Sequence, residues 1–210
     1  MPETANLFAF ALLALGMVLT PGPNMIYIIS RSLSQGPTAG LISLGGVALG
    51  FVFYVVAAAL GITALLLAVP LAYDVLRFCG AAYLLWLAWQ VLRPGGASPF
   101  QVRKLAKDGP KRLFMMGLMT NLLNPKVAVM YLSLLPQFIS PENGHVLSQL
   151  LVLGALQISV SLSVNSMIAL TAGSIANFLA ERPAWVLAQR WLMGTVLAAM
   201  ALRMATEARR

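Results

Sequence analysis

The amino-acid sequence predicts an all-α integral membrane protein with six transmembrane helices, arranged as two inverted three-helix repeats with broken first and fourth helices. Composition is the first observation behind this prediction, because 60% of the residues are hydrophobic and only 10% are charged, whereas soluble domains carry about 25% charged residues. The uncharged stretches from Glu3 to Arg31 and from Arg31 to Asp74 are the second, since each exceeds the roughly 20 residues that span a bilayer. The third is a helix break that recurs in both halves.

Six apolar spans can be placed along the chain from its hydrophobicity and its interruptions. They cover about Asn6–Ser34, Thr38–Ala68, Tyr73–Leu92, Lys111–Phe138, His145–Leu179 and Ala184–Met204. The first, second, fourth and fifth are long, so each either tilts in the bilayer or consists of two half-helices joined by a break. Turn-forming residues follow the first and fourth spans, in SQGPTAG (Ser34–Gly40) and ISPENGH (Ile139–His145).

The only sizeable hydrophilic loop lies between the third and fourth spans. Its segment Arg93–Arg112 carries six basic residues against one acid, Asp108, so the positive-inside bias places it in the cytoplasm. The predicted organisation is a single membrane domain, with a first three-helix repeat over residues 1–92, a basic cytoplasmic loop over 93–111 and a second repeat over 112–210. Six spans then place both termini on the far side, and a five-span topology with one re-entrant segment stays open.

A repeat relates the two halves of the chain. Aligning Pro21 with Pro125, at an offset of 125 − 21 = 104, brings several conformationally demanding residues into register. The further matched pairs are Tyr27 with Tyr131, Pro37 with Pro141, Gly40 with Gly144 and Gly50 with Gly154. Because each half has three spans, the second half enters the membrane from the opposite side, as in secondary transporters whose broken helices meet near the midplane. The alternative is a helix bundle with two unrelated proline kinks.

Each break contains residues that can begin a new half-helix. In NPK, Asn124 can cap the helix and Pro125 can take its first position, where the missing N–H has no partner to lose. In TPGPN (Thr20–Asn24), the threonine or the glycine can cap, and either proline can open the next half-helix. A helix N-terminus offers free N–H groups and about half a positive charge. Two such ends facing each other near the midplane would favour a carboxylate.

Lys126 is the only charged residue deep inside a predicted span. A lysine at the bilayer centre costs roughly 2.5–3.5 kcal/mol on insertion scales, so its side chain should face the protein interior or water. The functional interpretation is a contact with a substrate carboxylate or a proton-linked group. The structural alternative is a lysine bonded to backbone carbonyls that the opposite break sets free.

Three other groups of residues are weaker candidates. Gln157, Ser161 and Asn165 share one helical face in the fifth span, where they could line a cavity or equally well form hydrogen bonds between helices. The pair Gly46 and Gly50 favours close helix packing over ligand contact. Asn121 precedes the NPK break by one turn and could stabilise it.

Several classes of function are disfavoured. The single cysteine, Cys79, cannot form an internal disulfide or a dithiol relay, and His145 is the only histidine, so we expect no metal site and no cofactor. A membrane-embedded enzyme would need a nucleophile–base pair, paired carboxylates or a metal in a cavity, and no acid lies deep in a predicted span. The net charge of +8 fits basic loops rather than nucleic-acid binding.

Two segments carry a resemblance to a known family. The first is PGPNMIYIISRSLSQGPTAGLISLGGVALG (Pro21–Gly50), and the second is FMMGLMTNLLNPKVAVMYLSLLPQFISP (Phe114–Pro141). They resemble the first-half and second-half motifs of the LysE/RhtB family of bacterial amino-acid exporters. The likeness covers essentially the whole chain, including its length, its basic middle loop and its half-repeats.

The resemblance implies a multi-pass protein of the bacterial inner (plasma) membrane, a secondary transporter that exports amino acids or amino-acid derivatives and is driven by the proton gradient. The expected partners are the lipid bilayer, a small amino acid or similar zwitterion, and protons as a candidate coupling ion; a homodimer is allowed. The alternative is an exporter or channel for another small carboxylated metabolite. The predicted substrate-binding residues are Pro21, Gly22, Pro23, Asn24, Asn121, Asn124, Pro125, Lys126, Gln157, Ser161 and Asn165.

Overall fold

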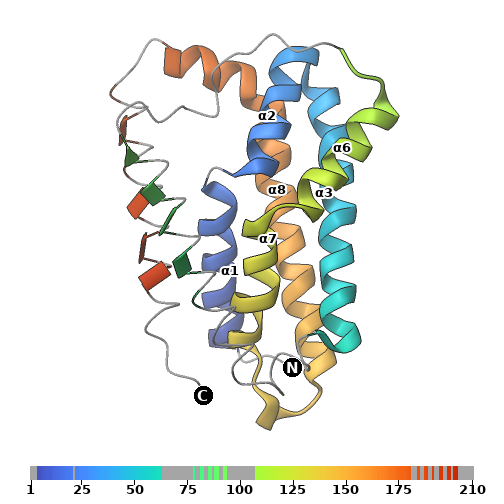
Figure 1. Ribbon diagram of the computed structural model, residues 1–210, viewed down its shortest axis with the longest axis vertical. Helices are drawn as coiled ribbons and strands as arrows, with labels where there is room; N and C mark the ends of the chain where they lie inside the picture. Colours follow the sequence, from blue (N-terminus) through green and yellow to red (C-terminus); the bar gives the residue numbers. More distant parts are fainter. Residues whose placement is uncertain are drawn as a thin grey trace.

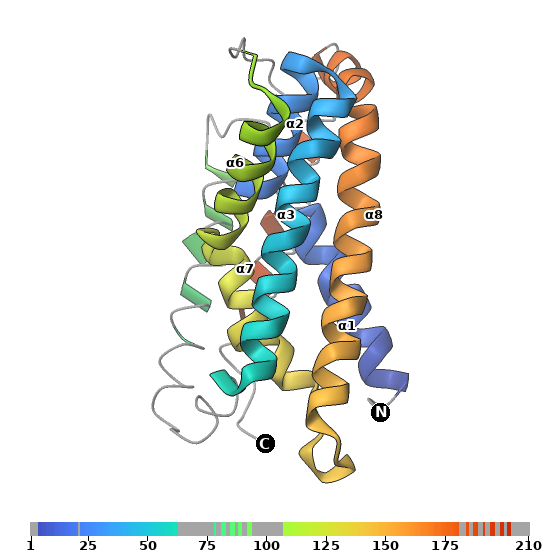
Figure 2. The same cartoon turned by 90° about the vertical axis from the view of Figure 1, so that its right-hand side faces the viewer.

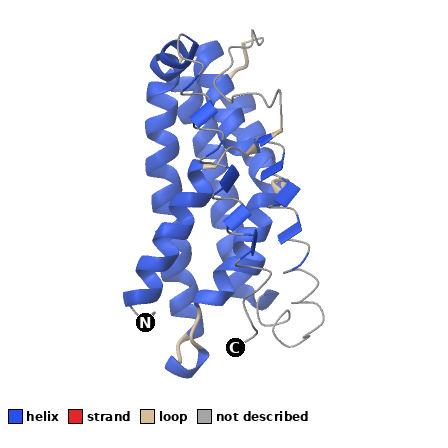
Figure 3. Ribbon diagram, turned by 90° about the vertical axis from the view of Figure 1, so that its left-hand side faces the viewer, coloured by secondary structure: helices blue, strands red, loops and turns tan. Residues whose placement is uncertain are grey.

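The computed structural model describes residues 4–20, 22–62 and 107–180, together with single residues between 78 and 93 and between 184 and 202. Over this part of the chain the structure contains six α-helices and no strand (Figure 3), which confirms the predicted all-α class. The longer helices lie side by side along one axis of the molecule (Figures 1 and 2).

The first predicted span is broken, as the sequence indicates. Helix α1 (Thr4–Leu19) and helix α2 (Pro23–Gln35) meet at an angle of 52°. Gly36 then turns the chain with a φ of 91°, in the left-handed region that glycine tolerates without a steric penalty. Helix α3 (Pro37–Ala57) follows and continues as a π-helical segment, Ala58–Ile62.

The fourth predicted span is broken in a similar way. Helix α6 (Pro110–Leu122) is followed at 50° by the shorter α7 (Pro125–Val129). The chain after α7 stays helical with changed winding, first as a π-helix and then as a 3₁₀-helix, over Met130–Leu134 and Leu135–Phe138. A 3₁₀ turn, Pro141–Asn143, leads into the 35-residue helix α8 (Val146–Ala180).

Corresponding helices in the two halves do not begin at the constant sequence offset of 104 that the repeat predicts. The half-helices α2 and α7 begin at Pro23 and Pro125, an offset of 125 − 23 = 102. Helices α3 and α8 begin at Pro37 and Val146, an offset of 146 − 37 = 109. The difference has a local cause, because the second half inserts the 3₁₀ turn Pro141–Asn143 where a single glycine joins α2 to α3.

The two broken spans run in opposite directions. In Figure 1 the chain rises from α1 to α2 and descends from α6 to α7. The half-helices α2 and α7 therefore begin at the middle of the molecule and point away from each other. Opposite directions are what an inverted repeat requires of its first and fourth spans. The full repeat includes the third and sixth spans, so it stays a prediction.

Glycine residues in the contact allow helices α3 and α6 to approach each other closely. A Cβ atom on Gly46 of α3 would collide with the carbonyl oxygen of Phe114 and lie 2.8 Å from the Leu118 nitrogen. A Cβ on Gly117 of α6 would collide with the carbonyl oxygen of Ser43. Gly50 faces the side chain of Asn121 in the same contact. Small residues at both surfaces allow this backbone approach, which confirms the packing role predicted for Gly46 and Gly50.

The apolar surface of the molecule agrees with a membrane environment. Two stretches, Pro37–Leu60 and Val146–Ile175, are long and apolar enough to cross a membrane, and each bent helix pair is a further candidate span. Large apolar side chains such as Phe8, Phe53, Leu123 and Met167 are more than half exposed. In lipid such side chains meet a solvent as apolar as themselves.

The third and sixth predicted spans, Tyr73–Leu92 and Ala184–Met204, lie largely outside the described residues. The single residues described within them are helical. Most of the loop 93–111 also lies outside, and its described end begins at Lys107.

A buried ion pair ties that end of the loop to α2. The Arg31 Nη1 atom lies 2.6 Å from Asp108 Oδ2, and the two side chains are only 9% and 7% exposed. The Gln35 side-chain amide exchanges two hydrogen bonds of 3.0 Å with the Asp108 backbone. The described end of the basic segment and the C-terminal end of α2 thus lie at the same end of the molecule.

Candidate functional site

The first break separates α1 from α2 at Thr20 and Gly22. The Thr20 hydroxyl donates back to the carbonyl oxygen of Gly16 at 2.7 Å, so it does not cap α2. Gly22 takes the N-cap position in extended backbone, with Pro23 next to it as the first helical residue. Of the capping arrangements that the sequence allowed, the structure thus has the one with Gly22 and Pro23. Pro21 lies outside the described residues.

The second break is capped as the sequence predicts. Asn124 is extended, with φ −84° and ψ 107°, because a following proline disfavours the helical conformation. Its Oδ1 atom accepts a hydrogen bond of 3.1 Å from the backbone N–H of Lys126. Pro125 opens α7 at the first helical position. One of the free donors of this half-helix is therefore already satisfied by its own cap.

Lys126 links the two breaks. Its side chain is buried, with 8% of the residue exposed, and its Nζ atom donates to the carbonyl oxygen of Thr20 at 2.5 Å. Gly22 leaves room for this path, because a Cβ there would lie 3.2 Å from Lys126 Cδ and 3.4 Å from Nζ. This contact is the structural role considered from the sequence. An ammonium group has three donors, so the Thr20 bond leaves others for a ligand.

Three polar residues of α8 form a second wall opposite the breaks. Gln157 accepts a hydrogen bond of 2.5 Å from the Tyr131 hydroxyl and donates one of 2.7 Å to Ser161 Oγ. The Asn165 Nδ2 atom donates to the Ser161 carbonyl oxygen at 2.8 Å. Both roles that the sequence left open for this face are therefore present, because Gln157 bonds across helices and all three residues line a cavity.

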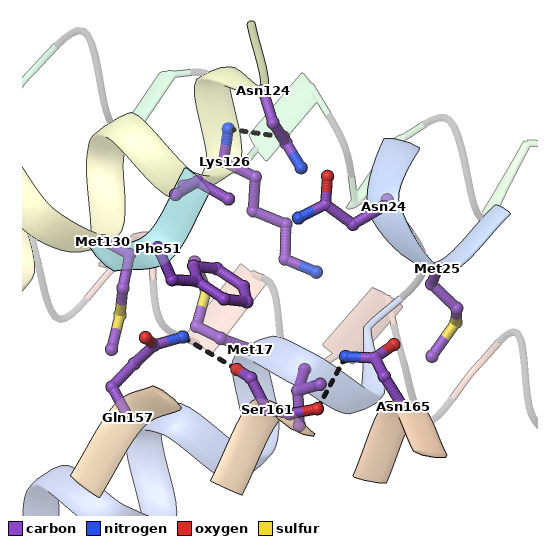
Figure 4. Close-up of a pocket in the computed structure, with 13 residues that line it drawn as sticks. Met17, Asn24, Met25, Phe51, Asn124, Lys126, Met130, Gln157, Ser161 and Asn165 are labelled. Atoms are coloured by element: carbon purple, nitrogen blue, oxygen red, sulfur yellow. Dashed lines mark hydrogen bonds between the residues drawn. The ribbon is translucent and has the colours of Figure 1, made fainter. Parts of the chain in front are cut away.

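A cavity of about 50 Å³ lies between the breaks and α8 (Figure 4). In the close-up, the Lys126 side chain extends toward the middle of the cavity, with Asn24 on one side and the α8 residues opposite. The residues that line it are Met17, Val18, Gly22, Asn24, Met25, Phe51, Asn124, Lys126, Val127, Met130, Gln157, Ser161 and Asn165. A water molecule needs about 10–15 Å³ by this measure, so the cavity holds a few waters and must widen for a larger ligand.

The structure brings together seven of the eleven predicted site residues. These are Gly22, Asn24, Asn124, Lys126, Gln157, Ser161 and Asn165. Pro23 and Pro125 are exposed and do not line the cavity, and they act on it only by setting the breaks. Asn121 is fully buried against Gly50 in the α3–α6 contact, so it does not line the cavity either.

Six lining residues were not predicted from the sequence. They are apolar: Met17, Val18, Met25, Phe51, Val127 and Met130. Nothing in a largely apolar chain distinguishes these residues from lipid-facing or core positions. Their place at the cavity follows from the bend angles and from the way α3 packs beside both breaks.

Few charged groups are present at the cavity. Among the lining residues described, Lys126 is the one cation and no side chain is acidic. Throughout the described part of the chain, no group of three or more His, Cys, Asp or Glu residues could hold a metal ion. The arrangement is thus suited to a small anionic or zwitterionic ligand with an apolar portion.

Comparison with known proteins gives a consistent family. The family model for LysE-type translocators matches residues 15–208. A homoserine/homoserine lactone efflux protein of Salmonella typhimurium is 34% identical over 173 residues, which is 82% of each chain. A leucine efflux protein of Salmonella choleraesuis is 25% identical over 201 residues, 96% of this chain and 95% of that protein.

A third relative is an uncharacterised membrane protein of Bacillus subtilis. It is 31% identical over 159 residues, covering 72% of this chain and 75% of that protein. No solved structure matches the chain significantly.

Proposed function

The chain belongs to the LysE-type translocator family and is therefore a transporter rather than an enzyme, and from this premise we propose that it exports amino acids or amino-acid derivatives across the bacterial inner membrane. Relatives named for the efflux of homoserine, homoserine lactone and leucine support this substrate class. We propose the proton gradient as the driving force and alternating access between two related halves as the mechanism.

The observation that carries the proposal is the buried lysine between two helix breaks. Lys126 supplies a cation at the cavity, and the bare N-terminus of α2 at Gly22 has no side-chain cap. Both features favour a carboxylate. The N-terminus of α7 is already capped by Asn124 and so adds less to this attraction, which leaves the lysine as the main carboxylate contact.

The rest of the lining favours a substrate whose side chain is uncharged. A second positive or negative group would remain unpaired in the cavity, because no acid and no further cation line it, and an unpaired buried charge is costly. The apolar residues Met17, Phe51 and Met130 can instead contact an aliphatic side chain.

Proton coupling must work without an acidic group in the cavity. Lys126 is the titratable residue among those that line it, so we propose that either this lysine or the substrate's own amine exchanges the proton. Export that persists at full rate without a proton gradient would contradict the coupling while leaving the substrate assignment intact.

The test is efflux from liposomes that contain the purified protein and a mixture of amino acids. An imposed proton gradient starts the reaction, and mass spectrometry records which species leave. We expect selective, gradient-dependent loss of one or a few neutral amino acids. If the inserted protein releases no amino acid but releases another carboxylated metabolite, the alternative function replaces this one; release without saturation or counterflow would indicate a channel.

A further inference from the structure

Two residues that line the cavity carry a side-chain oxygen with no hydrogen-bond partner in the described part of the protein. These oxygens are the Oδ1 atoms of Asn24, on α2, and of Asn165, on α8. Both residues are more than nine-tenths buried, with exposed fractions of 8% and 3%, and both line the cavity. Buried acceptors normally have a donor, so two of them at one cavity point to a ligand that brings donors.

The neighbouring polar groups are already occupied. Gln157 and Ser161 bond to each other, and Gln157 also accepts from Tyr131. Asn124 uses its oxygen as the cap of α7. The Asn165 nitrogen donates to the Ser161 carbonyl, which identifies the remaining atom of that amide as the oxygen. Among the lining side chains, Asn24 and Asn165 are therefore the ones whose amide oxygen accepts no hydrogen bond in the described part of the protein.

An amino acid brings the matching chemistry. Its carboxylate fits Lys126, but its ammonium group finds no carboxylate at the cavity, because none of the described lining residues is acidic. Amide oxygens can take that place, since hydrogen bonds from a charged donor are short and strong. An ammonium group has several donors, enough in number for both oxygens.

We infer that Asn24 and Asn165 form the ammonium subsite of the cavity and decide that the substrate must carry an amine. The inference rests on the proposed function, because it assumes that an amino acid occupies the cavity. Asn24 lies next to the first break and Asn165 lies on the continuous helix α8. The ammonium group thus bridges a half-helix and the wall opposite it.

The test compares amino acids with analogues in which a hydroxyl group replaces the amine. L-leucine and L-homoserine are the probes, with the corresponding 2-hydroxy acids as analogues, and affinity is measured by competition in the efflux assay. The variants are Asn24→Leu and Asn165→Leu, which keep the approximate size of the side chain. Asn143→Leu is the matched control, because Asn143 is exposed in the turn before α8 and lies outside the cavity.

The wild-type protein is expected to prefer the amino acid over the hydroxy acid by about tenfold or more, as expected for a charge-assisted hydrogen bond. Each cavity variant should lose most of that preference by binding the amino acid more weakly, with little change for the hydroxy acid. The Asn143→Leu protein should retain it. Lys126→Ala should instead weaken both compounds, because they share the carboxylate.

Two results would overturn the ammonium subsite but leave the proposed function intact. In the first, the inserted cavity variants bind the amino acids as the wild type does. In the second, the variants lose affinity for the amino acid and the hydroxy acid equally. The second result would indicate a merely structural role. A wild-type protein that binds neither amino acid would overturn the proposed function for these substrates together with the subsite.

Discussion

At the scale of single residues, Lys126 combines two roles that are usually treated as alternatives. It donates to the Thr20 carbonyl oxygen of the opposite break, and it is the cation of the cavity. A carboxylate that enters can share the ammonium group or take it from Thr20. Either exchange would change how the two breaks are held together, so binding and conformational change would act on the same atom.

The substitution Gly22→Ala tests how precisely the side chain of Lys126 must be positioned. In Gly22→Ala the new methyl group lies 3.2 Å from Lys126 Cδ, which forces the flexible lysine chain to shift slightly. Because φ at Gly22 is −162°, alanine fits the backbone without strain. We expect a raised KM for efflux and a nearly unchanged Tm.

The control for this substitution is Gly109→Ala, since a Cβ at Gly109 meets nothing within 4 Å. Its KM should equal that of the wild type. If Gly22→Ala also leaves KM unchanged, the exact position of the lysine chain is unimportant.

The polar residues of the site could largely be predicted, and the apolar ones could not. A lysine or a row of polar side chains in an apolar span stands out because burying such groups costs free energy. Met17, Phe51 and Met130 carry no such cost and look like any other apolar residue. Asn121 is a candidate because it precedes the NPK break by one turn, but the close approach of Gly50 places it in a helix contact, which only the packing reveals.

At the scale of elements, the two breaks have local sequence causes and could be predicted. The cap of the second break could be predicted as well, whereas the sequence left Thr20 and Gly22 open as caps of the first. The first, fourth and fifth spans begin and end within a few residues of the predicted limits, and the second begins at Pro37, while its predicted end at Ala68 lies outside the described residues. The π-helical and 3₁₀ segments after α7 could not be predicted, because changed winding depends on how the neighbouring helices pack. The repeat offset shifted because the connecting turns differ in length.

Pro125→Ala tests whether the second break is needed for transport. Without the proline, Asn124 is free to adopt helical dihedral angles, and α6 can continue into α7 with a smaller bend than 50°. We expect efflux to fall severely while the protein still inserts and stays folded, measured by efflux rate and thermal unfolding. Wild-type efflux from this variant would mean that the break is tolerated rather than required.

Gly46→Ala tests the contact between α3 and α6. The added Cβ meets the Phe114 carbonyl oxygen and the Leu118 nitrogen, which are backbone atoms and cannot move aside alone. Overpacking costs about 1–3 kcal/mol, so Tm in detergent should fall by several degrees.

Gly45→Ala is the matched control, because a Cβ there lies at an ordinary 3.5 Å from the Phe114 ring. Its Tm should change little. Equal Tm values for the two variants would contradict the close contact.

At the scale of the whole molecule, the broken spans run in opposite directions and place α2 and α7 on opposite sides of one cavity (Figures 1 and 4). The Arg31–Asp108 ion pair connects the C-terminal end of α2 with the residues just before α6. The charge bias places the loop that contains Asp108 in the cytoplasm, but the direct contact of Asp108 with Arg31 could not be predicted, because it depends on how α2 packs beside α6.

Asp108→Asn tests that connection. The substitution leaves Arg31 without its carboxylate partner in a site where both side chains are nearly buried. Removing one partner of a buried pair costs about 3–5 kcal/mol, so Tm should fall clearly. Arg112→Ala is the control, since Arg112 reaches the same carboxylate at 3.1 Å but is 72% exposed, and exposed pairs contribute about 0–1 kcal/mol. An equal effect of both substitutions would contradict the importance of the buried pair.

The proposed function requires Lys126 to hold the carboxylate of an exported amino acid between the two breaks. The most direct test is the efflux of L-leucine and L-homoserine from liposomes that contain the wild type, Lys126→Ala or Lys111→Ala. Lys111 is exposed, so its loss removes the same charge away from the cavity. We expect Lys126→Ala to insert normally and to export neither compound, while Lys111→Ala exports as the wild type does. Efflux from Lys126→Ala at the wild-type rate would contradict that requirement.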